Sequence, residues 1–173
     1  MTAVFVSVGR HATPLQRQAC EAVLARVAAV GLQPHRLLDA GRTGEAPLPE
    51  IRRLIDSCHG TLVLAHARYA FERGHERVHD GATQPLQDVR FPTAWNQIEA
   101  AFACARGHPL LVVCEEGLKA DGLLEDAYGW PVHRCEFRPE AFERPEFTAV
   151  LLAWRARVLD HALRAARRGD NAP

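Results

Sequence analysis

Lysine is almost missing from this chain of 173 residues: Lys119 is the only one, so the other twenty basic residues are arginines. Basic and acidic residues balance at 21 each, which gives a formal net charge of zero at pH 7. Binding to nucleic acid or to an acidic membrane surface requires clustered, uncompensated positive charge. We therefore expect neither nucleic acid nor a membrane among the partners of this protein.

Long apolar runs and secretion signals are missing as well. Apolar runs such as 61–65 and 110–114 have about five residues, whereas a membrane-spanning helix needs about twenty. The N-terminus, Met1-Thr2-Ala3-Val4-Phe5, has neither the basic region nor the cleavage site of a secretion signal. The five cysteines are odd in number, and no two form a C-x-x-C pair. We predict reduced thiols and a cytoplasmic location.

The excess of arginine has two interpretations. Arginine binds phosphate and carboxylate groups with a planar, forked side chain, so one interpretation is a phosphate-binding protein. The chain is also very rich in alanine, which indicates a compositional bias of the genome instead. We favour the compositional interpretation and give weight only to arginines in positions where a ligand would bind.

Short apolar runs alternate with helical repeats along the chain. Strand–helix alternation of this kind implies a parallel sheet covered on both faces. The predicted fold class is α/β: a doubly wound, flavodoxin-like five-stranded parallel sheet with helices on both faces, in one domain of residues 1–173. Residues 68–92 show no clear period and form an insert in this pattern. Strands are expected at 3–8, 34–38, 61–66, 109–114 and 132–137, and helices at 14–30, 48–58, 94–105 and 147–168.

In such sheets a ligand binds beyond the carboxyl ends of the strands, where the strand order reverses. The segments to consider begin at Ser7, His66 and Cys114. After the first strand, Gly9 and Arg10 precede a helix whose N-terminal N–H groups could bind a phosphate. The segment has neither G-x-G-x-x-G nor G-x-x-x-x-G-K, so an ordinary turn before a helix is the alternative.

The segment His75-Glu76-Arg77-Val78-His79 matches H-E-x-x-H, the zinc metallopeptidase motif. That chemistry requires both imidazoles on one helical face, together with a third ligand. The segment lies between glycines and has little apolar periodicity, so we do not expect a helix there. We interpret the match as coincidental and predict no metal site.

Trp95-Asn96-Gln97-Ile98-Glu99 lies at the start of a predicted helix, at the ligand-binding edge of the sheet. Trp95 and Glu99 are four residues apart and therefore share one helical face. A carboxylate beside an aromatic ring suits chemistry at an anomeric carbon, where it stabilises an oxocarbenium-like transition state or attacks as a nucleophile. The alternative is a tryptophan in the core and a solvated glutamate near the positive end of a helix.

At this point the chain resembles the TIR (Toll/interleukin-1 receptor) domains and, more distantly, the nucleoside 2-deoxyribosyltransferases of the same architecture. TIR domains that cleave NAD carry a W-x-x-x-E signature at the start of a helix, which Trp95 to Glu99 match. The similarity spans roughly residues 3–136. The other matching segments are Val4-Phe5-Val6-Ser7, 39–44 with the helix at 51–57, 62–65 followed by Tyr69, and 109–113.

The resemblance implies an enzyme that cleaves the N-glycosidic bond of NAD, as a glycohydrolase or cyclase, in bacterial antiphage defence. NAD would be the substrate, with no cofactor. Glu99 would be the catalytic residue, assisted by Trp95 and Asn96. It also implies a homo-oligomer and an effector or sensor protein as a further partner. The expected substrate-binding residues are Phe5, Ser7, Gly9, Arg10, Arg42, His66 and Tyr69.

Two departures from the TIR pattern keep alternatives open. About twenty-five residues, rather than a short loop, separate the third strand from Trp95, so the insert at 68–92 is expected to form a lid or a specificity-determining wall. The first alternative is an N-glycosidase similar to the nucleoside 2-deoxyribosyltransferases, although Phe91-Pro92-Thr93-Ala94-Trp95 lacks their usual motif. The second is a non-catalytic adaptor or nucleotide sensor, which a buried or arginine-paired Glu99 would favour.

Overall fold

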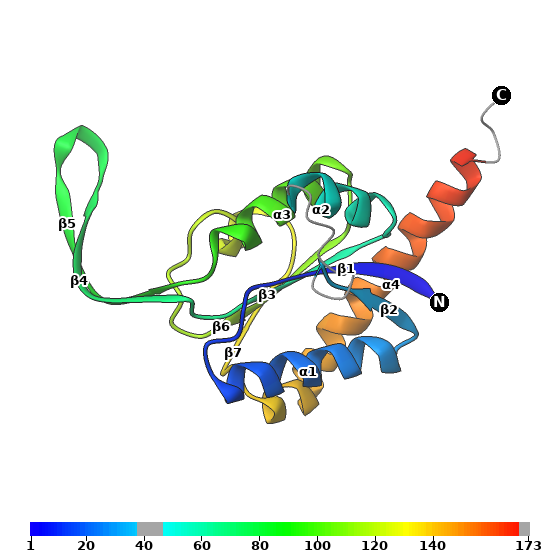
Figure 1. Ribbon diagram of the computed structural model, residues 1–173, viewed down its shortest axis with the longest axis horizontal. Helices are drawn as coiled ribbons and strands as arrows, with labels where there is room; N and C mark the ends of the chain where they lie inside the picture. The colour runs from blue at the N-terminus through cyan, green and yellow to red at the C-terminus, as the bar shows by residue number, and fades with distance from the viewer. Residues whose placement is uncertain (38–46, 170–173) are drawn as a thin grey trace.

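Five parallel strands form the central sheet of the computed structural model, which describes residues 1–37 and 47–169. Their order, β2-β1-β3-β6-β7, is that of a doubly wound flavodoxin-like sheet, as predicted. Helices α2 and α3 cover one face, and α1 and α4 cover the other (Figure 1). The strands are β1 (Thr2–Val8), β2 (Leu32–His35), β3 (Thr61–Ala65), β6 (Leu110–Glu115) and β7 (Val132–Cys135).

Local sequence signals determine where the helices begin. Thr13 caps α1, because its hydroxyl accepts a hydrogen bond from the Gln16 amide at 3.1 Å, and Pro14 suits the first helical position. Thr93 caps α3 in the same way. The helices are α1 (Pro14–Ala29), α2 (Pro47–Asp56), α3 (Ala94–Ala105) and α4 (Pro145–Gly169), with short 3-10 turns at His79–Gly81 (η2), Gly122–Leu124 (η3), Asp126–Tyr128 (η4) and Pro139–Glu143 (η5).

The side chains of each strand alternate between the two faces of the sheet, where they join three hydrophobic cores. On the α1 and α4 side, Val4 and Val6 pack with Trp154, whose indole N–H donates to the Pro109 carbonyl at 2.9 Å. On the other side, Phe5 packs with α2, and β3 and β6 pack with α3. Strands that are buried on both faces read as continuous apolar runs, which is why the sequence predicted β1, β3 and β6 to within one residue at each end.

The second strand lies earlier than the prediction of 34–38. It begins at Leu32, which is fully buried and pairs with Thr2 of β1. Gly31 ends the preceding helical segment with a positive φ of 81°, so the chain enters the sheet at once. The predicted turn at 39–44 lies outside the described residues.

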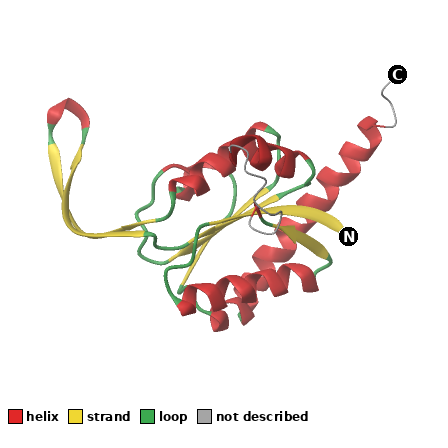
Figure 2. Ribbon diagram, in the orientation of Figure 1, coloured by secondary structure: helices red, strands yellow, loops and turns green. Residues whose placement is uncertain are grey.

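The insert at 68–92 is an antiparallel hairpin of β4 (Tyr69–Arg77) and β5 (Thr83–Phe91). It projects from the body of the protein as a two-stranded arm (Figures 1 and 2). No residue of 69–91 is buried, so neither face of the hairpin needs an apolar pattern, and the sequence shows none.

None of the helices in the described parts of the chain is long and apolar enough to span a bilayer.

Candidate functional site

The strand order reverses between β1 and β3, at the carboxyl ends of these two strands. The chain leaves β1 toward one face of the sheet and reaches α3, after β3 and the hairpin, on the other face. Ser7 pairs with Val63 at this edge. A reversal of strand order of this kind is the usual ligand-binding position of doubly wound sheets.

Helix α3 brings an amide and a carboxyl group to this edge. Its buried residues are Asn96, Glu99, Ala100 and Ala103, a spacing that turns one helical face toward the sheet. Asn96 is 1% exposed and Glu99 is 7% exposed. The first turn of this face is polar, and the later turns are apolar.

Ser7, Asn96 and Glu99 form one buried polar group. The side-chain amide of Asn96 donates a hydrogen bond to Ser7 Oγ at 2.9 Å. Burial raises the pKa of Glu99 to about 7, and a hydrogen bond with the Ser7 side chain opposes this rise. A carboxyl group with this pKa exists in both protonated and ionised forms at neutral pH, which is the usual condition for acid–base or nucleophilic work.

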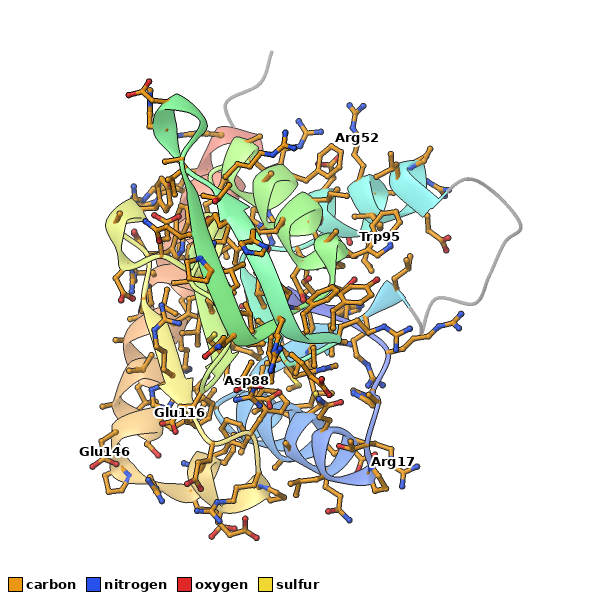
Figure 3. All side chains as sticks on the ribbon, turned by 90° about the vertical axis from the view of Figure 1, so that its left-hand side faces the viewer. Arg17, Arg52, Asp88, Trp95, Glu116 and Glu146 are labelled. Carbon is orange, nitrogen blue, oxygen red and sulfur yellow. The ribbon has the colours of Figure 1, made fainter. Side chains whose placement is uncertain are left out.

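The remaining predicted site residues near the start of α3 and the end of β1 differ from Glu99 in how far they are exposed. Trp95 is 41% exposed, so it is not a core anchor. Gly9 lies directly against the cap of α3, because a Cβ atom at this position would be 3.0 Å from Thr93 Cγ2. Arg10 is exposed, and Arg42 lies outside the described residues. Figure 3 shows Trp95 at the start of α3, viewed from the side on which the hairpin projects.

Two predicted binding residues do not join this group. Phe5 is 1% exposed and packs with Ile51 and Ile55 in the core. His66 is on the opposite face of the sheet from Glu99, because it follows Leu62 and Leu64 in the strand alternation and its ring lies 5.6 Å from that of Phe137. His66 follows the carboxyl end of β3 but faces the other side of the sheet. Phe5 is on the same face as Ser7, but it pairs with Thr61, the first residue of β3, away from the carboxyl ends.

Tyr69 lines a different cavity. It is 52% exposed and pairs with Phe91 at the base of the hairpin. A pocket of about 290 Å³ opens there, and neither Ser7 nor Glu99 lines it. The lining residues are Tyr69, Phe91, Pro92, Thr93, Ala94, Gln97, Lys119, Asp121 and Leu124.

The H-E-x-x-H segment does not have metallopeptidase geometry. His75 is on β4 and His79 is in the turn of the hairpin, so no helix presents the two imidazoles together. The structure instead assembles a group that the sequence analysis missed. Within residues 1–37 and 47–169, the potential ligand atoms of His11, Cys20 and His66 all lie within 4.8 Å of one another.

Comparisons with known proteins add little to this description. No protein-family model matches the chain, and no curated protein matches it. One solved structure that it resembles is a CMP N-glycosidase from Clostridium botulinum, with 11% sequence identity and a TM-score of 0.49. The matched region covers 82% of this chain and 95% of that chain. The strand order of the central sheet establishes the fold class.

Proposed function

We propose that the protein is an N-glycosidase of nucleosides or nucleotides in which Glu99 acts at the anomeric carbon. The observation that carries this proposal is a carboxyl group at the switch-point edge of the sheet, 7% exposed, with a pKa raised to about 7. Burial of a carboxyl group costs free energy, and carboxyl groups with pKa values raised in this way are concentrated at functional sites.

The chemistry requires few groups. The bond between C1′ and the base nitrogen breaks, and its electrons leave with the base. The Glu99 carboxylate stabilises the developing positive charge at C1′ or attacks it, and water then supplies the new oxygen at C1′. The attacking water loses a proton as its oxygen bonds to C1′. An ordinary leaving base gains a proton from protonated Glu99 or from solvent, so the two balance, whereas nicotinamide leaves NAD as a neutral molecule and the proton of the water goes to solvent.

Ser7 and Asn96 act as positioning residues in this proposal. The Ser7 oxygen accepts from the Asn96 amide, so its hydroxyl hydrogen is available to the Glu99 carboxylate. A fixed donor of this kind orients the carboxylate and favours its ionised form. The TIR resemblance also implies that NAD is the substrate and that the protein acts in antiphage defence. Both stay predictions.

The test is a search for released base. The protein is incubated with NAD, CMP, and purine and pyrimidine ribonucleosides and deoxyribonucleosides, and free bases and sugars are measured by mass spectrometry. We expect release from at least one substrate and a loss of roughly 10²–10⁴-fold in Glu99→Gln. Glu72→Gln, which changes an exposed carboxylate on the hairpin, is the matched control. Full activity of Glu99→Gln contradicts the proposal.

The burial of Glu99 also favours the second candidate, a nucleotide sensor without catalysis. A side chain that is 7% exposed suits a polar core position as well as a catalytic one. A sensor predicts that a nucleotide raises the melting temperature while no base is released. It also predicts that Glu99→Gln binds the nucleotide as the unchanged protein does.

A further inference from the structure

Three side chains with ligand atoms converge on the α1 face of the sheet, opposite Glu99. His11 follows β1, Cys20 lies on α1 and His66 follows β3. Their potential ligand atoms lie within 4.8 Å of one another, and the two imidazole rings are 5.5 Å apart. Cys20 is 1% exposed, His66 is 2% exposed and His11 is partly exposed.

The two histidines have unsatisfied ring nitrogens. Within residues 1–37 and 47–169, neither ring nitrogen of His66 makes a well-aligned hydrogen bond, although backbone groups of Ala67 and Gly9 lie near enough to raise its pKa, and Nδ1 of His11 makes none. A buried polar atom without a partner destabilises the fold. Such atoms call for an explanation, and a metal ion that accepts their lone pairs is one.

We propose that His11, Cys20 and His66 bind one divalent cation of the zinc class. Imidazole nitrogen and thiolate sulfur are the ligands that Zn²⁺ prefers, and three protein ligands leave a fourth position for water or another ligand. On binding, the Cys20 thiol releases its proton to solvent, and the two imidazoles bind as neutral rings. Burial lowers the pKa of both histidines, which favours the neutral form.

The geometry requires only small movements. Zinc ligands at 2.0–2.3 Å from a tetrahedral ion are about 3.3–3.6 Å apart, so atoms up to 4.8 Å apart must approach by about 1 Å. His11 is partly exposed on a loop and can rotate toward the other two side chains, which also gives an ion access from solvent.

Gln16 holds the segments that carry both histidines. Its side-chain oxygen accepts from the Ala12 amide at 2.8 Å, and its side-chain nitrogen donates to the Ala67 carbonyl at 3.0 Å. The residues next to His11 and His66 are therefore fixed to the same side chain of α1. Support of this kind around the ligands is typical of metal sites.

The charges near the group are mixed. Burial raises the pKa of Cys20 to about 12, so the thiol must give up its proton when an ion binds. Arg36 opposes this rise, and it also acts on His11. Glu21 acts on the same two side chains with the opposite sign, and Glu115 acts on His66. A bound cation therefore has negative charge close by, from the thiolate and from two carboxylates.

Cobalt(II) is the probe for this site. We expect the purified full-length protein to bind one equivalent of Co²⁺, with a thiolate-to-cobalt charge-transfer band in the near ultraviolet and visible bands of tetrahedral cobalt. One equivalent of Zn²⁺ should bleach these bands. Cys20→Ser should abolish the charge-transfer band, and His66→Gln should weaken binding by more than the roughly 10–100-fold that follows loss of an outer-shell partner.

Matched controls distinguish this site from other thiols and histidines. His75→Gln with His79→Gln removes the H-E-x-x-H match, and Cys104→Ser removes an exposed thiol. Both variants should keep the spectrum. His11→Gln changes a partly exposed loop residue, so it gives the same test without a change in the core. Absence of the charge-transfer band from the unchanged protein, or its persistence in Cys20→Ser or undiminished Co²⁺ affinity in His11→Gln, overturns the proposal.

Discussion

The side-chain amide of Asn96 donates a hydrogen bond to the Ser7 hydroxyl at 2.9 Å and joins α3 to the end of β1. Asn96 is 1% exposed and Ser7 is fully buried, so the bond is shielded from water. Since the Ser7 oxygen accepts this bond, its hydrogen is available to Glu99, whose pKa the Ser7 hydrogen bond lowers. The ionisation of Glu99 therefore depends on Ser7, which is ninety-two residues earlier in the chain.

Replacement of Ser7 by alanine should raise the pKa of Glu99 above its value of about 7. The hydroxyl stabilises the ionised carboxylate, so its loss leaves burial to act alone. Carbon-13 NMR of the glutamate carboxyl groups across a pH titration measures this change directly. Ser57→Ala is the matched control, because the Ser57 hydroxyl is exposed and donates to the Leu54 carbonyl instead. An unchanged Glu99 titration in Ser7→Ala contradicts the role assigned to this bond.

Glu99 should make the fold less stable as the pH rises. Its pKa is about 7 in the folded protein and 4.5 without burial, so between these values the folded state binds the proton more tightly. The contribution of the protonated carboxyl is complete below about pH 4.5 and is lost through pH 7. We expect the unchanged protein to lose roughly 3 kcal/mol relative to Glu99→Gln over this range. Urea unfolding at pH 4.5 and pH 8 measures the difference, and parallel curves for the two proteins would contradict it.

His108 should have the opposite effect. Burial first, and then His161 and His59, lower its pKa to about 4 from 6.5, and Nδ1 lies 3.0 Å from Thr61 Oγ1. The unfolded chain binds the proton more tightly between these values, so stability is complete above pH 6.5 and is lost as the pH falls through 4. His108→Gln should remove roughly 3 kcal/mol of this loss in the same unfolding series. His79→Gln, in the hairpin turn, should leave the pH dependence unchanged.

The sequence predicted α3 at its observed bounds of 94–105 because its signals are local. Thr93 is a good capping residue, and Gly107 allows the positive φ of 71° that follows the helix. The surroundings of its side chains were less predictable. The apolar Ile98 is 39% exposed, whereas the ionisable Glu99 is buried. The buried face of α3 begins with the polar residues Asn96 and Glu99, so the spacing of apolar residues does not identify it.

The hairpin had a signal that the sequence analysis did not use. Asp80 and Gly81 both have positive φ, at 63° and 78°, which is the geometry of a type I′ hairpin turn, and Asp-Gly is a preferred pair in that turn. The metal-ligand group could not have been found in this way. His11, Cys20 and His66 are far apart in sequence, and only the positions of β1, β3 and α1 bring them together.

Removal of the hairpin arm should leave the fold nearly as stable as before. We consider replacement of residues 72–88 by an Asn-Gly turn, which joins the paired residues Phe71 and Val89. Among the described residues, the three cores contain no side chain from β4 or β5. The change breaks a partly exposed ion pair between the arm and the body, Lys119 with Glu76 at 2.5 Å, and removes the fully exposed pair of His79 with Asp80. The expected change in the free energy of unfolding is below about 1 kcal/mol. Urea unfolding of both proteins measures this change, and a large loss of stability would show that the arm supports the fold. Light scattering on both proteins gives their molar masses and so also tests the predicted homo-oligomer.

Gly60 and Val158 should show strong energetic coupling. A Cβ atom on Gly60 would lie 2.5 Å from Val158 Cγ2, and Val158 is fully buried on α4. Gly60→Ala should therefore cost about 1–3 kcal/mol through overpacking, and Val158→Ala roughly 2 kcal/mol through lost burial. The double variant should cost less than the sum by at least about 1 kcal/mol, because the new methyl group occupies the vacated space. Gly74→Ala is the control, since its nearest neighbour would be 4.0 Å away. Additive costs in denaturant unfolding would mean that α4 shifts away from Gly60 instead of clashing with it.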